Sequence, residues 1–153
     1  MRALLILLVV VGLATAVRGA DTVDGRVVKV LPLLLDLKGR AALSPSLFDR
    51  DAYQALLREQ ATNVSALRFD VLWRATKAPA EKIKIDVEIR GIGTNSIPKL
   101  QTMETNVVPG TFRRWTYIPF GGEAYRNFGR VVAWRVTLWD EDRLLSEQKS
   151  FLW

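Results

Sequence analysis

Three stretches of this chain alternate apolar and polar residues with a period of two. Their apolar members are Leu67, Phe69, Val71 and Trp73, then Ile83, Ile85, Val87 and Ile89, and finally Val132, Trp134, Val136 and Leu138. Because successive side chains on a strand point to opposite faces, each stretch predicts a strand with one buried and one wet face. The sequence therefore predicts a mainly β fold.

The third stretch opens a predicted hairpin at residues 130–153. Asp140-Glu141-Asp142 interrupt the alternation with turn-forming residues, and a second extended segment is expected from Leu144 onward. Because this segment finishes on Phe151-Leu152-Trp153, we expect it to dock into a sheet along its whole length.

The remaining segments complete a pattern of about seven short strands. Residues 27–37 predict a first strand that Pro32 breaks and confines to a sheet edge. Residues 100–108 and 111–118 predict further strands, and the glycine-containing residues 119–129 predict a loop.

Residues 44–58 carry the one helical signal, with Ser46 and Asp49 at the spacing of a capping box. Short antiparallel strands with one short helix near the N-terminus are typical of an immunoglobulin-like or fibronectin-III-like antiparallel β-sandwich, which we predict as the fold.

The first 20 residues predict a cleaved signal peptide. Arg2 precedes an apolar run of about fifteen residues, and small residues follow at a suitable cleavage position. A membrane-spanning helix needs about 20 apolar residues, and Arg18 ends this run too early. We therefore expect a secreted or periplasmic protein with one domain at residues 21–153, not an integral membrane protein after cleavage.

Charge gives no reason to expect a nucleic-acid partner. Removing residues 1–20 would take away two arginines and no acid, so the formal net charge would fall from +6 to +4. A mildly basic, exported chain is not typical of nucleic-acid binding.

The chain contains no histidine and no cysteine. This excludes serine triads, cysteine dyads and nearly all zinc and copper sites. Carboxylate chemistry and oxygen-ligated calcium remain open, but Asp140, Glu141 and Asp142 lie too close together to flank a substrate and lack the spacing of a calcium loop. We therefore expect no enzymatic activity, no cofactor and no metal site.

Surface aromatics and arginines are the candidate ligand-binding groups. Trp139 is out of phase with the apolar residues around it, whereas Trp73, Trp115 and Trp134 share their phase with aliphatic neighbours and are expected in the core. Arginines are dense between residues 113 and 135, where the alternative interpretation is a solvated sheet face. The candidates are Trp139, Tyr117, Tyr125, Arg126 and Arg130.

The segments RVVAWRVTLWDEDRLLSEQKSFLW (130–153) and SPSLFDRDAY (44–53) resemble small exported bacterial proteins of unassigned function that have such a sandwich. The resemblance implies no catalytic residues. The expected function is a non-enzymatic binding or structural module of the bacterial envelope, and the alternative is a carbohydrate-binding module that uses surface aromatics and arginines. The expected partner is an envelope protein or an anionic glycan. An envelope-protein partner would instead require an uncovered sheet edge near Pro32 for strand addition.

Overall fold

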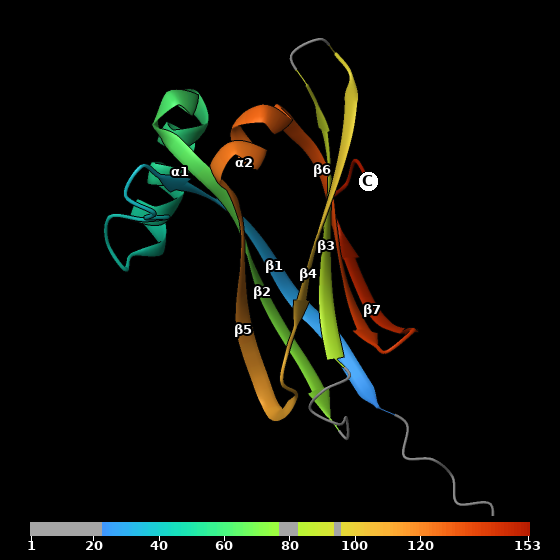
Figure 1. Cartoon of the computed structure of the whole chain (residues 1–153). Helices are drawn as coiled ribbons and strands as arrows, with labels where there is room; N and C mark the ends of the chain where they lie inside the picture. Colours follow the sequence, from blue (N-terminus) through green and yellow to red (C-terminus); the bar gives the residue numbers. More distant parts are fainter. Residues whose placement is uncertain (1–22, 77–82, 94–95) are drawn as a thin grey trace, which may run out of the picture.

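The computed structural model describes residues 23–76, 83–93 and 96–153, and the predicted signal peptide lies outside them. The described residues form seven strands in two antiparallel sheets. The three-stranded sheet has the order β1 (Asp24–Asp36), β2 (Val64–Thr76) and β5 (Gly110–Gly121). The four-stranded sheet has the order β4 (Pro98–Asn106), β3 (Ile83–Ile92), β6 (Arg130–Asp140) and β7 (Arg143–Lys149). Figure 1 shows them as two layers, so the predicted mainly β fold is confirmed.

The three alternating stretches supply the shared core between the sheets. Phe69 and Trp73 of β2 face Ile85 and Val136 of the other layer's strands, and all of these side chains are essentially inaccessible. The indole Nε1 of Trp73 donates to Thr116 Oγ1 at 2.8 Å, so its polar atom is satisfied within the layer. Each such side chain contributes about 1.5–3 kcal/mol through burial, which makes this core the main source of stability.

Pro32 lies in an edge strand, as the sequence predicted, but it does not break that strand. β1 pairs with β2 from Asp24 to Asp36, with one irregularity between Val27 and Lys29. The amide of Leu34 points away from β2, toward a side chain of the first helix. Because positions two apart face the same way, the missing N–H of Pro32 falls on the outer edge and costs the ladder no hydrogen bond.

The prediction of one helix near the N-terminus was wrong. The helix α1 (Leu47–Glu59) follows the complete strand β1, and a second helix, α2 (Gly122–Phe128), replaces much of the predicted 119–129 loop. A short 3-10 turn, η1 (Ala61–Asn63), connects α1 to β2. The glycines suggested a loop, but Gly122 takes a φ of 66° to start α2, and Phe128 then buries its ring against the core.

The predicted hairpin forms, but its second strand is shorter than expected. β7 ends at Lys149, and Phe151 is fully exposed. Trp153 is held differently, because the guanidinium carbons of Arg90 and Arg135 lie 3.9 and 4.9 Å from its ring centroid. The final residues therefore fold over the outer face of the four-stranded sheet instead of extending it.

Asp36 fastens the end of β1 to α1. Its carboxylate accepts hydrogen bonds from the Lys38 and Arg40 amides and from the Tyr53 hydroxyl, each at 2.8 Å. These bonds, above all that from the Arg40 amide, hold the pKa of Asp36 well below its ordinary value. The ionised form of Asp36 is therefore part of the folded structure.

The pKa of Asp86 is shifted in the opposite direction from that of Asp36. Asp86 lies on the outer face of the four-stranded sheet, and its Oδ1 has no hydrogen-bond partner among the described residues. Its Oδ2 lies 3.7 Å from Lys84 Nζ. Burial raises the pKa of Asp86, which the Lys84 charge only partly offsets, and the nearby Glu104 raises it further.

We predict opposite stability changes for two isosteric substitutions. At pH 7, Asp36→Asn should lower the melting temperature and Asp86→Asn should raise it. Because the Asp36 pKa is depressed, its contribution is complete above about pH 4 and is lost progressively below that value. Because the Asp86 pKa is raised, its penalty is complete only above that raised pKa and disappears as the pH falls to about 4.

Thermal unfolding of both variants and the parent chain between pH 3 and 8 checks this prediction. The two variants serve as controls for each other, since each removes one carboxylate charge. Melting temperatures that move in the same direction at pH 7 would contradict it.

Candidate functional site

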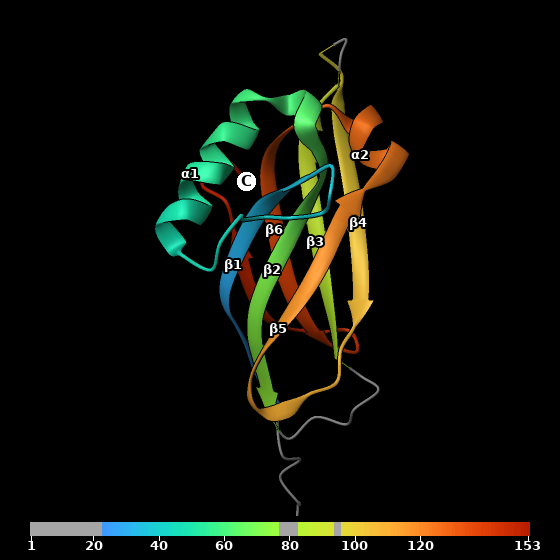
Figure 2. The same ribbon diagram turned by 90° about the vertical axis from the view of Figure 1, so that its left-hand side faces the viewer.

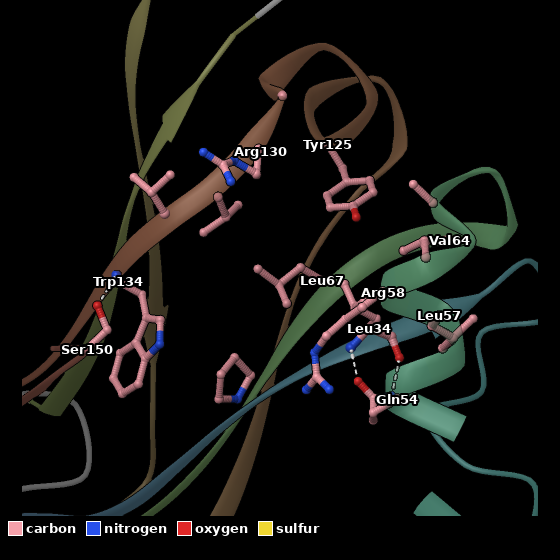
Figure 3. Close-up of a pocket in the computed structure, with 15 residues that line it drawn as sticks. Leu34, Gln54, Leu57, Arg58, Val64, Leu67, Tyr125, Arg130, Trp134 and Ser150 are labelled. Atoms are coloured by element: carbon pink, nitrogen blue, oxygen red, sulfur yellow. Dashed lines mark hydrogen bonds between the residues drawn. The ribbon is translucent and has the colours of Figure 1, made fainter. Parts of the chain in front are cut away.

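A pocket opens at the side of the molecule, between the edge of β1 and the first half of β6 (Figure 3). We call it the lateral pocket, and its volume is about 690 Å³, within the ~300–1,000 Å³ range of small-molecule sites. It is lined by Pro32, Leu34, Gln54, Leu57, Arg58, Ala61, Val64, Leu67, Tyr125, Gly129, Arg130, Val131, Val132, Trp134 and Ser150. Most of this surface is hydrocarbon.

The pocket exists because β7 is shorter than β6. β7 pairs with β6 only from Arg135 to Asp140. At the next position Ser150 takes its place, since the Ser150 amide donates to the Trp134 carbonyl and the Trp134 amide donates to Ser150 Oγ. Within the part of the chain that the structure describes, no strand pairs with residues 130–133 on that side, so the space between the layers is left open there.

Gln54 of α1 closes the opposite wall. Its Oε1 accepts from the Leu34 amide, and its Nε2 donates to the carbonyls of Leu34 and Ala41, at 2.8–2.9 Å. The side chain thus does what a neighbouring strand would do for the edge of β1. Gln54 is only 2% exposed, so these bonds are protected from water.

Four polar side chains of the lining have free hydrogen-bonding groups. Among the described residues, no hydrogen bond is made by the Tyr125 hydroxyl or Trp134 Nε1, and no ion pair by Arg58 or Arg130. In Figure 3, Trp134 lies on one side of the pocket, Arg58 on the other, and Tyr125 and Arg130 at the end between them. Burial raises the pKa of Tyr125, so its phenol keeps its proton at neutral pH.

The five sequence-predicted ligand residues do not form one site. Tyr125 and Arg130 both line the lateral pocket. Arg126 is exposed on α2 outside that lining, and Tyr117 is 57% exposed on the outer face of the three-stranded sheet. Trp139 is half-buried on the outer face of the other sheet, with its Nε1 donating to Thr137 Oγ1.

The pocket residues that sequence reasoning did not select as ligand-binding groups include Gln54, Arg58 and Trp134, and one further tryptophan was misplaced. Gln54 and Arg58 join the pocket because α1 lies along β1, and Trp134 joins it because β7 pairs with β6 only as far as Arg135. No local pattern predicts either arrangement. Trp115 was expected in the core but is 41% exposed. The alternation in β5 was recognised, but Ile118 and Phe120 define its inner face, and Trp115 is out of phase with them.

No described helix is both long and apolar enough to cross a membrane. Within the same residues, no group of three or more histidine, cysteine, aspartate or glutamate side chains is arranged so that it could hold a metal ion.

Comparison with known proteins does not place the chain in a family. No protein-family model matches it, and neither the curated proteins nor the solved structures include a significant match.

We predict that Gln54→Ala destabilises the fold by about 1–3 kcal/mol, because it leaves buried edge groups of β1 without partners. Urea unfolding measures the change. Gln60→Ala is the matched control, because Gln60 lies at the exposed end of the same helix and bonds only an exposed asparagine through its side chain. Equal effects of the two substitutions would refute the assigned role of Gln54.

Proposed function

We propose that this chain is an exported, non-enzymatic binding module of the bacterial envelope and that its ligand enters the lateral pocket. The sequence of residues 1–20 supports export. The pocket lining supports binding over hydrolysis, because the described residues that form it include no carboxylate. The lack of histidine and cysteine in the whole sequence supports the same conclusion.

We also propose that the two sheets form an immunoglobulin-like or fibronectin-III-like sandwich. Three strands in the order β1-β2-β5, facing four in the order β4-β3-β6-β7, support an immunoglobulin-like or fibronectin-III-like sandwich. Such domains serve as scaffolds for many different binding surfaces, so the ligand depends on the residues of the site and not on the fold.

The free polar groups in the pocket can all donate hydrogen bonds, and this property supports the proposal most strongly. Arg58 and Arg130 can only donate hydrogen bonds, as can Trp134 Nε1, and the protonated phenol of Tyr125 can also donate. They surround an apolar lining that includes Leu57 and Val64. A fitting ligand has a hydrocarbon body and an acceptor-rich anionic group.

We therefore assign the ligand to the amphiphiles with a carboxylate or phosphate head. Its hydrocarbon part would lie against the apolar lining, where each buried methylene contributes about 0.8 kcal/mol. Its head would lie at the rim between the two arginines. The apolar lining makes a fully polar anionic glycan a poorer match for this pocket.

The strand-addition alternative has less support. The edge of β1 is covered on both sides of Pro32: by Gln54 at Leu34, and by Ser146 and Gln148 at Val27 and Val28. A partner strand would first have to displace these side chains.

Calorimetric titration with dodecanoate tests the proposed function. We expect binding to the parent chain, and about fivefold weaker binding to Arg58→Ala and Arg130→Ala, since each arginine is exposed and contributes about 1 kcal/mol. Dodecanol should bind all three proteins equally, because it lacks the charge.

Ala61→Trp should fill the pocket mouth and weaken dodecanoate binding at least tenfold. Ala55→Trp is the matched control, since Ala55 is exposed on α1 but does not line the pocket. The proposal fails if the parent chain does not bind dodecanoate, or if Ala61→Trp binds it as well as Ala55→Trp does.

A further inference from the structure

A second concave surface lies on the outer face of the three-stranded sheet. The connection between β1 and α1 passes in front of β1 and β2 (Figure 2) and leaves a groove between itself and the sheet. We call this the outer groove, and its volume is about 530 Å³. It is lined by Leu31, Leu33, Ala41, Ala42, Ser44, Pro45, Leu47, Arg50, Arg68, Asp70, Trp115 and Tyr117. None of these residues lines the lateral pocket.

Two aromatic rings form one side of the outer groove. Trp115 and Tyr117 are two residues apart on β5, so both point outward, and they are 41% and 57% exposed. The Arg68 guanidinium carbon lies 5.1 Å from the centre of the Tyr117 ring. Among the described residues, the Trp115 ring has no aromatic or cationic partner. An exposed indole face is thus available for a ligand.

A partly buried ion pair lies beside these rings. Arg68 Nε and Nη2 donate to the two carboxylate oxygens of Asp70 at 2.6 and 2.9 Å. Asp70 is only 7% exposed, although it belongs to the outer face of the sheet. Asp70 lies directly opposite Tyr117, so Trp115 is its diagonal neighbour, at a distance of about 7–8 Å.

This arrangement offers donors and acceptors side by side with no net charge. Two forked bonds leave Arg68 with further N–H groups and Asp70 with unused lone pairs. A hydroxyl both donates and accepts, so neighbouring hydroxyls on one ring match this pair. The face of an aromatic ring is electron-rich and attracts the C–H groups on the flat face of a sugar.

From these contacts we infer that the outer groove binds a neutral pyranose of a glycan chain. The sugar ring stacks on Trp115, and its hydroxyls bond the Arg68–Asp70 pair. Tyr117, held by Arg68, borders the adjacent position. This site is independent of the lateral pocket and of the amphiphile proposed there.

The main rival occupant is a proline-rich peptide, which also docks into aromatic-lined grooves. The free carbonyls of such a peptide could accept hydrogen bonds from Arg68, but its prolines have no N–H to donate to Asp70. It would therefore leave Asp70, which lines the groove, without a donor from the ligand. The pair has both donors and acceptors, which match the hydroxyls of a sugar. Because the pair has no net charge, it gives no advantage to an anionic ligand.

Titration with soluble hexasaccharides, followed by the five tryptophan indole N–H signals in ¹H–¹⁵N spectra, tests this inference. The probes are the hexamers of glucose, N-acetylglucosamine, mannose and xylose, with decaproline as the rival ligand. We expect at least one hexasaccharide to shift the Trp115 signal and to leave the Trp139 signal unchanged. Trp115→Phe assigns the signal.

Trp115→Ala, Tyr117→Ala and Asp70→Asn should each weaken the binding of that hexasaccharide, the first about tenfold or more. Trp139→Ala is the matched control, since it removes an indole from the opposite outer face, and Ala61→Trp tests independence from the lateral pocket; neither should change the affinity. The inference is overturned if no hexasaccharide shifts the Trp115 signal, if only decaproline does, or if Trp139→Ala weakens binding as much as Trp115→Ala.

Discussion

The attachment of α1 to the edge of β1 determines the shape of both concave surfaces. Gln54 bonds the backbone of Leu34, and Asp36 binds Tyr53 together with the amides of the following turn. These contacts place α1 beside the sheet as one wall of the lateral pocket. They also direct the chain before α1 across the outer face of β1 and β2, where it borders the outer groove. One set of hydrogen bonds therefore shapes two separate surfaces.

Sealing of sheet edges explains why the pocket lies where it does. An open edge invites pairing with other chains, and folded proteins protect such edges. β1 uses Pro32, which carries no donor, and side chains from α1 and β7 that bond its backbone. β6 has such protection only up to Trp134, because β7 ends there and Ser150 makes the last bonds. The lateral pocket lies where, among the described residues, the edge of β6 is covered neither by β7 nor by side chains that bond its backbone.

Sequence patterns predicted the strands well because alternation is a local property. The faces of Ile83–Ile92 and of the β6 core positions follow directly from a period of two. The same rule misplaced Trp115, because the choice between two faces in β5 depends on which one meets the other layer. The helix α2 was missed because Gly122, which starts it with a positive φ, also fits a loop.

The candidate site was harder to predict, because its residues meet only through tertiary packing. Tyr125 and Arg130 were identified from residue type and do share a pocket, whereas Trp139 and Tyr117 lie on the outer faces of different sheets. Gln54 carries no functional signature in the sequence, since its importance comes from the unpaired edge that it meets. A pattern with a period of two or 3.6 cannot report which edge strand lacks a neighbour.

Asp70 and Asp86 lie on different outer faces, and their surroundings differ: Asp70 is buried and Asp86 is partly buried. Asp70 is opposite Tyr117 and shares both carboxylate oxygens with Arg68, so its charge is compensated by a planar fork. Asp86 is opposite Glu104 and Thr137, and one of its oxygens has no partner among the described residues. Like charges on neighbouring strands repel, so the environment of Asp86 favours its protonated form. On the Asp70 face, a nearly buried carboxylate with both oxygens bonded lies beside Trp115 and Tyr117, which are 41% and 57% exposed, whereas Trp139 is half-buried. For that reason we place the second binding surface there and not around Trp139.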